Sequence, residues 1–399
     1  MRIGLVIPQT PGYSETFFNS KIKGLQDNGI EVHVYCQSKK DNFTLCPVVE
    51  GPKVTHNLFL QAWYFLKEFL MLLPYIPVVL RYFKLERNEG VGISQIAKNT
   101  YLNAHLLKAK LDWLHFGFAT QALGSETVAK AIGAKLAVSL RGFDVNVYPI
   151  KNPGCYTKLW PHIDKVHSIS QYLLNKAMDM GLPVETPFAI ITPAVQLHSL
   201  PKPAATSTTA HLKITTIARL TWIKGLDVAI AAMKILKDTG VQCTYTIIGD
   251  GDKNYRERYK FMVYEMGLED VVIFQGKLSH EETLTYLNTT DIYVQPSLNE
   301  GFCNAVLEAQ ALGKLTLASR VGGLPENIID TKTGWLFESS SPEFLVKKIE
   351  IILGLSETDK NNISKTAIQR VRDEFNIENQ QAKFVSFYSE ELIIKNQNN

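Results

Sequence analysis

The sequence predicts an α/β protein built from two doubly wound parallel sheets, each in its own domain. The chain has 399 residues, which is about two to three times the usual length of one domain. Short β-branched runs alternate with helical patterns in both halves, as is typical of parallel sheets covered by helices. A stretch rich in Pro, Ala, Ser and Thr, residues 199–211, lies between the halves and has the composition of a linker.

The expected strands and helices alternate in order along the chain. In the first half we expect a helix over residues 15–28 and strands at Ile3–Pro8, Ile30–Cys36, Trp113–Phe116, Leu136–Leu140 and Val166–Ile169. In the second half we expect strands at Leu212–Ala218, Thr244–Ile248, Val271–Phe274, Ile292–Gln295 and Leu315–Ala318, with helices over about 224–237, 255–266, 279–288 and 304–312. Ser279 with Glu282 forms a capping-box pattern, and Pro342 suits the first turn of a helix.

These elements predict one domain over residues 1–198 and a second over 212–375. We expect the last segment, 376–399, to be a helix that packs back on the first domain. Ligands of doubly wound sheets bind beyond the carboxyl ends of the strands, where loops lead into helix N-termini. A ligand site is therefore expected in a cleft between two facing domains.

The composition narrows the class of protein. Lys plus Arg number 42 against 39 for Asp plus Glu, a net charge of +3, and no arginine-rich run occurs, so a nucleic-acid partner is not expected. The five cysteines are scattered without a C-x-x-C pair, which predicts neither a disulfide framework nor a zinc site. The N-terminus lacks the long apolar core of a signal peptide. We therefore expect a cytoplasmic enzyme.

The strongest local motif is NEGFCNAVLEAQALG, residues 299–313. Glu300 falls in the loop before an expected helix, and Glu308 lies more than a turn inside it. The N-terminus of such a helix attracts anions, and carboxylates accept hydrogen bonds from sugar hydroxyls. The motif thus suits a ligand with both phosphates and hydroxyls. The alternative is a capped amphipathic helix with surface glutamates.

Two further motifs follow strands of the second half. In LKITTIARLTWIKG, Arg219 and Lys224 lie at a strand-to-helix turn, where two cations suit a diphosphate. In SRVGGLPENI, Gly322 and Gly323 allow a close approach of the backbone to a ligand. Taken singly, the cations could be solvated surface charges and the glycine pair an ordinary turn.

In this order and spacing, the motifs resemble the family-4 glycosyltransferases, retaining enzymes of the GT-B fold. The similarity continues through IIGDGD, GKLSHEE, GGLPENI and TGWLF. In the first half, PGYSETFF (residues 11–18) and LDWLHFG (residues 111–117) resemble the branch that builds bacterial surface polysaccharides, colanic-acid-like or lipopolysaccharide glycans. The resemblance implies two Rossmann-like domains facing each other across a cleft, with the acceptor side in the first and the nucleotide sugar in the second.

The implied reaction moves a sugar from a UDP- or GDP-linked donor to a glycan or lipid-linked acceptor, with retention and without a metal or other cofactor. The resemblance implies catalytic roles for Arg219, Lys224, Glu300 and His115, in which the two cations stabilise the leaving diphosphate. The implied donor-binding residues are Gly12, Gly249, Asp250, Gly276, Lys277, Leu278, Gly301, Phe302, Cys303, Asn304 and Glu308. The implied acceptor-side residues are Glu15, Arg141 and Asp144.

The sequence departs from the family pattern in two places. Arg141-Gly142 stands where many relatives have His-Gly, and Gly12 is a single glycine where some relatives carry two. A metal-binding alternative also exists at Asp250-Gly251-Asp252, because D-x-D after an apolar strand holds manganese in glycosyltransferases of another fold. Two other functions stay open: a non-catalytic sensor of sugar nucleotides, and a phosphorylase or synthase of the same fold.

Residues 58–85 are the most apolar stretch of the chain. The uncharged run Phe69–Leu80 is too short to span a bilayer, which needs about 20 residues. Aromatic residues beside Lys67, Arg81 and Lys84 suit peripheral contact with an anionic membrane, such as the inner face of the cell membrane. The alternative is a buried helical pair, broken at Pro74 and Pro77.

Overall fold

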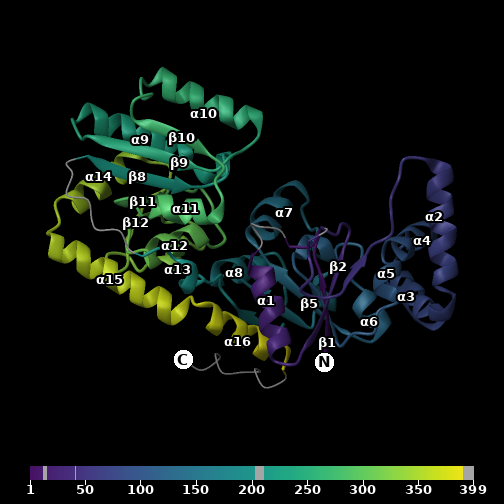
Figure 1. The fold of residues 1–399 in the computed structure, drawn as a ribbon. Coiled ribbons are helices and arrows are strands. Elements are labelled where there is room, and N and C mark those ends of the chain that lie inside the picture. Colours follow the sequence, from purple (N-terminus) through teal and green to yellow (C-terminus); the bar gives the residue numbers. More distant parts are fainter. Residues whose placement is uncertain (12–15, 41, 203–210, 390–399) are drawn as a thin grey trace. The chain divides into compact units, whose positions relative to one another are not determined.

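The computed structural model describes residues 1–11, 16–40, 42–202 and 211–389, which form two compact units (Figure 1). The first unit takes the described residues up to Ile191 and those from Gln380 onward. The second unit takes those from Thr192 to Asn379. The last helix, α16 (Ile377–Tyr388), starts in the second unit and ends in the first.

The first unit is built on a parallel sheet with the strand order β3-β2-β1-β4-β5-β6-β7. Its strands are β1 (Arg2–Val6), β2 (Glu31–Cys36), β3 (Val48–Glu50), β4 (Trp113–Phe116), β5 (Lys135–Leu140), β6 (Lys165–Ser168) and β7 (Phe188–Ile190). Every neighbouring pair in this sheet is parallel. The central strands are buried nearly throughout, as expected for a sheet covered on both faces.

Helices connect these strands as crossovers. They are α1 (Thr16–Asp27), α2 (Leu58–Met71), α3 (Ile76–Asn88), α4 (Ile93–Leu102), α5 (Ala104–Leu107), α6 (Val128–Ile132), α7 (Tyr148–Lys151) and α8 (Gln171–Asp179). Phe18 and Ile22 of α1 share one core cluster with Ile3 of β1 and with Phe384 and Phe387 of α16. The C-terminal helix therefore completes the core of the N-terminal sheet.

The second unit has a parallel sheet of order β10-β9-β8-β11-β12-β13. Its strands are β8 (Leu212–Ile217), β9 (Cys243–Ile248), β10 (Val272–Gly276), β11 (Ile292–Gln295), β12 (Leu315–Ser319) and β13 (Trp335–Phe337). One face packs against α9 (Leu226–Asp238), α10 (Lys253–Glu265) and α14 (Pro342–Leu353). The other packs against α11 (His280–Leu287), α12 (Asn304–Ala311) and α13 (Leu324–Asn327), and α15 (Glu357–Glu374) packs on α12.

The predicted fold class is confirmed, because both units are parallel α/β sheets. The ten predicted strands all occur, and their ends agree to within one or two residues. Ser279 and Glu282 form the predicted capping box, and Pro342 lies in the first turn of α14. Three further strands, β3, β7 and β13, were not predicted; each has three residues and lies at the edge of a sheet. Strands this short carry too little alternation to be recognised.

The apolar stretch forms α2 and α3, joined by a short 3-10 turn, Leu73–Tyr75, that contains Pro74. None of the residues of α2 is buried, so the expectation of a buried helical pair is wrong for this helix. Among the described residues, no single helix is long and apolar enough to cross a membrane. Leu58–Met71 and Leu73–Asn88 meet the test of length and composition only as a pair, with a bend of 50° between them.

Candidate functional site

The predicted donor-binding residues of the second unit gather at one edge of its sheet. Because all six strands run parallel, the loops that follow β8 to β12 leave from the same edge. Backbone hydrogen bonds join these loops to one another: Leu220 N to Asp250 O (3.0 Å), Gly249 N to Gly276 O (2.9 Å), Leu298 N to Ile223 O (2.8 Å) and Gly323 N to Glu300 O (2.9 Å). The edge is therefore a connected set of loops rather than five separate turns.

Lys224 and Glu300 form an ion pair at the centre of this edge. Lys224 Nζ lies 2.5 Å from Glu300 Oε2, and both side chains are largely buried, with 17% and 15% exposed. Burial works to lower the pKa of Lys224, but the Glu300 carboxylate outweighs it and the net shift is upward. Lys224 is thus a fixed positive charge at the carboxyl ends of β8 and β11. The turn after it needs Gly225, whose φ is +59° and whose added Cβ would lie 2.1 Å from Pro296 O.

The glycine pair of the third motif packs against the backbone of Glu300. Gly322 has a φ of +56°, and a Cβ added there would lie 2.1 Å from the carbonyl oxygen of Glu300. Gly323 N donates to the same oxygen at 2.9 Å. We predicted that this pair would let the backbone approach a ligand; in the structure, Gly322 approaches the backbone of the loop that carries Glu300.

The residues after Glu300 lead into α12. Gly301 and Phe302 are buried, Cys303 precedes the helix, and Asn304 is its exposed first residue. Cys303 N donates to Asn327 Oδ1 (3.0 Å), and Asn327 Nδ2 donates to Cys303 O (3.1 Å). Burial raises the pKa of the Cys303 thiol to about 12, so this group is a neutral thiol near pH 7. Cys303 therefore contributes packing and backbone geometry rather than a thiolate.

Glu308, the second carboxylate of the motif, lies on α12 and pairs with His280. His280 Nε2 and Glu308 Oε1 are 2.8 Å apart. The hydrogen bond to Glu308 is the main cause that raises the pKa of His280 above its usual value. Each of the two carboxylates of the motif thus has a basic partner from a neighbouring loop.

The remaining predicted donor residues occupy the same edge. Arg219 is exposed and follows β8, while Gly276, Lys277 and Leu278 end β10 and lead to the capping box of α11. Gly249 and Asp250 follow β9. In the D-x-D motif, Asp252 caps α10 by accepting from Tyr255 N (3.0 Å), and Asp250 Oδ2 lies 3.5 Å from Arg256 Nη1. Within the described residues, no group of three or more His, Cys, Asp or Glu side chains is arranged to hold a metal ion.

His115 lies on β4 in the first unit and is fully buried. Its Nδ1 is 2.7 Å from Tyr388 Oη, and its Nε2 is 2.8 Å from Ser139 Oγ, which also contacts His167 Nδ1 at 2.8 Å. Burial lowers the pKa of His115 well below its usual value, and Lys21 nearby lowers it further, so the imidazole is neutral. A sugar could reach His115 only if neighbouring side chains moved, and its predicted catalytic role stays a prediction.

Arg141 and Asp144 join the loops that follow β4 and β5. Arg141 Nε donates to Gly117 O at 3.0 Å, and its guanidinium lies over the Phe17 ring. Asp144 is buried and accepts from Thr120 Oγ1 at 2.7 Å and from the backbone N–H groups of Thr120 and Arg141. Asp144 thus holds the loop in place, while Arg141 is partly exposed. Gly12 and Glu15, the other predicted residues of this unit, lie outside the described residues.

Two residues that contact the predicted site residues, His280 and Asn327, were not predicted from the sequence. A signal for His280 was present, because the capping box placed it at the first position of α11, directly after the predicted loop Gly276–Leu278. Asn327 gave no comparable signal, since its bonds to Cys303 join residues 24 positions apart in the chain. Only the packing of α13 against α12 brings these two residues together.

Comparison with known proteins finds similarity to glycosyltransferases. The family model described as "Glycosyl transferases group 1" matches residues 204–370. WcaL of Escherichia coli, named for colanic acid biosynthesis, is 26% identical over 94% of this chain and 96% of its own. The amylovoran biosynthesis glycosyltransferase AmsK of Erwinia amylovora is 27% identical over the same shares. The structure of Anabaena Alr3699/HepE in complex with UDP and glucose matches with a TM-score of 0.72 at 16% identity, over 97% of this chain and 98% of that one.

These findings define the class of the protein. The chain is a glycosyltransferase of the GT-B fold, with a group 1 domain over residues 204–370. The resemblance to the branch that builds surface polysaccharides is likewise confirmed by the two relatives that match along nearly the whole chain.

Proposed function

We propose that this chain is a retaining, metal-independent glycosyltransferase that moves a sugar from a UDP- or GDP-linked donor to a glycan or lipid-linked acceptor in surface polysaccharide biosynthesis. The observation that carries the proposal is the largely buried Lys224–Glu300 pair at the carboxyl edge of the second sheet, with Arg219 exposed on the same loop as Lys224. The names of WcaL and AmsK support the polysaccharide acceptor, and the UDP and glucose bound to HepE support the donor class.

The proposed chemistry follows from where charge develops. As the bond from the anomeric carbon to the diphosphate oxygen breaks, negative charge grows on the diphosphate. Arg219 and Lys224 stabilise it, and a fixed cation at such a position is typically worth about 3 kcal/mol or more in the transition state. Glu300 then binds hydroxyls of the donor sugar, and Glu308 binds the ribose.

We propose front-face attack for the sugar transfer. The acceptor hydroxyl oxygen bonds to the anomeric carbon on the face that the diphosphate leaves, and its proton passes to a phosphate oxygen. A double displacement would need a carboxylate free to attack the anomeric carbon. Glu300 is held by Lys224 and Glu308 by His280, so neither carboxylate is a free nucleophile, although each keeps lone pairs that can accept from sugar hydroxyls. This arrangement favours the front-face route.

The test is a panel of UDP- and GDP-sugars with measurement of nucleotide release. We expect release from at least one donor, unchanged by a metal chelator, and product with the anomeric configuration of the donor by NMR. Lys224→Ala should lower release at least 100-fold, while the matched surface variant Lys347→Ala should retain it. Tight nucleotide binding without any release would instead support a sensor, and loss of activity in the chelator would restore Asp250 and Asp252 as metal ligands.

A further inference from the structure

The first unit exposes an unusual amount of apolar surface on α2 and the start of α3. Eleven large apolar side chains between residues 58 and 83 are exposed. The most exposed are Leu58 at 83%, Phe59 at 91% and Trp63 at 61%. Contiguous apolar patches on a protein surface mark interaction sites, whereas single exposed apolar residues need no explanation.

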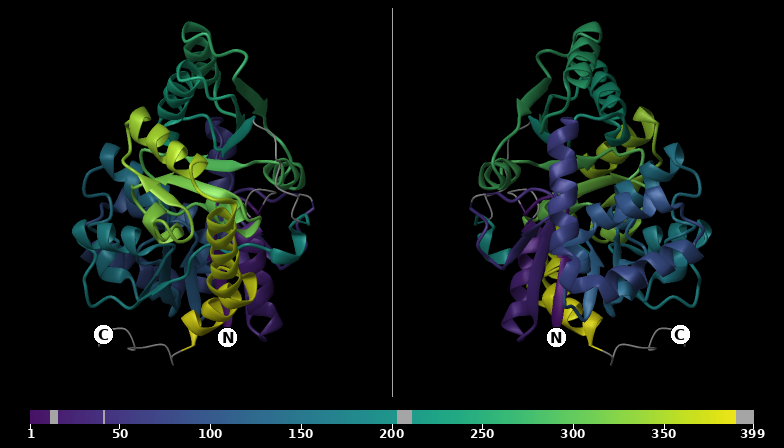
Figure 2. Two further views of the ribbon diagram at one scale, coloured as in Figure 1. Left: turned by 90° about the vertical axis from the view of Figure 1, so that its left-hand side faces the viewer. Right: turned by 90° about the vertical axis from the view of Figure 1, so that its right-hand side faces the viewer.

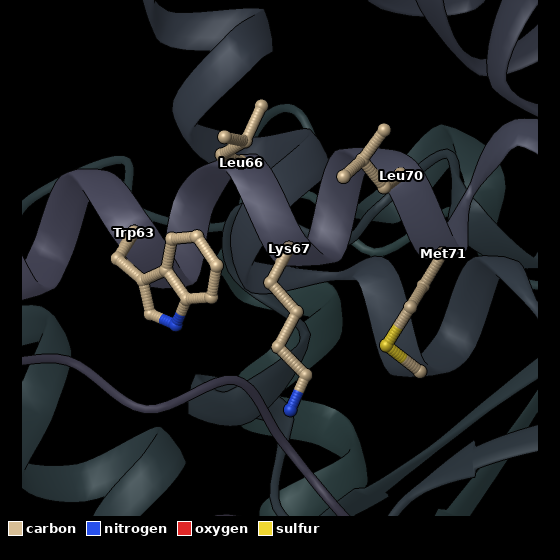
Figure 3. Close-up of a pocket in the computed structure, with 5 residues that line it drawn as sticks. All are labelled: Trp63, Leu66, Lys67, Leu70 and Met71. Carbon is tan, nitrogen blue, oxygen red and sulfur yellow. The ribbon is translucent and has the colours of Figure 1, made fainter.

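These side chains form a stripe on the outer face of α2. Phe59, Trp63, Leu66 and Leu70 follow one another at intervals of four, three and four residues, which places them on one face of a helix. Figure 3 shows two rows on this helix, Leu66 and Leu70 in one and Trp63, Lys67 and Met71 in the other. The groove between the rows has a volume of about 280 Å³.

The opposite face of α2 is also apolar, and it holds the helix on its own unit. The Phe65 ring lies 5.2 Å from the Tyr101 ring and 4.6 Å from the Phe69 ring. A surface helix of a protein surrounded only by water would have polar residues on its outer face. The outward stripe is therefore not needed to attach α2. Figure 2 (right) shows α2 in the foreground, with no other helix of its unit in front of it.

The acidic and basic side chains of α2 and α3 differ in their exposure to solvent. The two carboxylates are turned inward: Glu68 pairs with Lys108 at 3.0 Å, and the buried Glu86 accepts from Thr127 Oγ1 at 2.6 Å and pairs with Lys158. The basic side chains, in contrast, are exposed; they are Lys67, Lys84, Arg87 and Arg81, of which Arg81 also donates from Nη1 to Ala131 O at 3.1 Å. The exposed surface from Leu58 to Arg87 thus combines apolar side chains with positive charge alone.

We propose that this surface, from Leu58 to Arg87, docks on a lipid bilayer that contains anionic headgroups, with the apolar stripe of α2 inserted below them. Anionic lipids complement the exposed cations, and an exposed Trp beside apolar residues suits the headgroup region. A second copy of this chain fits less well, because a symmetric contact would bring two sets of the four cations together.

The geometry indicates that α2 lies along the membrane rather than through it. The 14 residues of α2 span only about 20 Å, against about 30 Å for the apolar core of a bilayer. The following helix cannot extend α2 into a span, because Tyr82 and Glu86 of α3 are buried in the unit. This inference deepens the proposed function, since it names the surface through which a lipid-linked acceptor would be met.

The test is sedimentation of the full chain with vesicles of phosphatidylglycerol and phosphatidylcholine, compared with phosphatidylcholine alone. We expect binding to the anionic vesicles and at least tenfold less to the neutral ones. Phe59→Ser with Trp63→Ser should weaken binding at least tenfold, because inserted aromatic side chains are lost. The matched control is Phe261→Ser with Tyr264→Ser, which removes aromatics of 62% and 65% exposure from α10 and should bind as the wild type.

The electrostatic part is tested by Lys67→Glu with Lys84→Glu. One cation near an anionic surface is worth about fivefold in binding, so this variant should bind at least tenfold more weakly. The control Lys347→Glu with Lys365→Glu changes the net charge equally but on helices of the second unit, and should retain binding.

The proposal is overturned if the Phe59/Trp63 variant sediments like the wild type, or if neutral and anionic vesicles bind alike. It is also overturned if that variant loses a dimer on gel filtration while vesicle binding persists. Vesicle binding needs no sugar donor, so Lys224→Ala should bind vesicles normally. Failure of the docking surface can thereby be told apart from failure of the proposed transferase activity.

Discussion

Replacing Gly322 by alanine should both destabilise the fold and impair the candidate donor site. An alanine there would adopt a φ of +56°, which costs about 1 kcal/mol for a residue with a Cβ. The new Cβ would also lie 2.1 Å from Glu300 O, so one of the two backbone segments must move. Overpacking of this kind costs about 1–3 kcal/mol. We therefore expect the free energy of unfolding to fall by about 2–4 kcal/mol.

The same movement displaces the loop that positions Glu300 against Lys224. A misplacement of about 1 Å in a site can lower the rate by about 100-fold, and we expect a loss of that order in nucleotide release. Gly267→Ala is the matched control, because Gly267 has a φ of +60° and nothing within 4 Å of an added Cβ. It should lose about 1 kcal/mol of stability and no activity. Both variants are measured for nucleotide release and for urea unfolding. Equal rates of release for Gly322→Ala and Gly267→Ala would show that the contact of Gly322 with Glu300 does not position the site.

Three further predictions concern ionisable side chains. Lys224→Ala should lower the turnover at least 100-fold, by the loss of about 3 kcal/mol of transition-state stabilisation, with an unchanged circular dichroism spectrum; a normal rate would remove Lys224 from the mechanism. The pKa of His280 is raised in the folded state, so its pair with Glu308 should stabilise the fold by under about 1 kcal/mol below about pH 6.5. This stabilisation should be lost as the pH rises through the raised pKa. His280→Gln should therefore reduce the urea midpoint at acidic pH and not at pH 9. Burial lowers the pKa of His115 and His167, so the unfolded chain binds more protons than the folded one as the pH falls. Acidification below about pH 6.5 should therefore destabilise the protein. A urea midpoint that does not change between pH 7 and pH 5 would contradict this.

Much of the candidate site in the second unit could be predicted from the sequence because its parts are local. Strands of four to six residues with β-branched side chains, followed by glycine and helix caps, specify where each loop leaves the sheet. In a parallel sheet the loops must then share an edge, so Arg219, Lys224, Glu300 and Glu308 were expected near one another. The ion pair Lys224–Glu300 bears out that proximity for these two residues.

Only the tertiary structure shows which residues from distant parts of the chain contact the predicted site residues. Gly322 proved to pack on Glu300, His280 to hold Glu308, and His115 to lie beneath the C-terminal helix against Tyr388, 273 residues away. The direction in which α2 turns its side chains was likewise open, since both of its faces are apolar in sequence. Local patterns fix which element forms, but burial and contact depend on which other elements cover it, and that is a property of the packed chain.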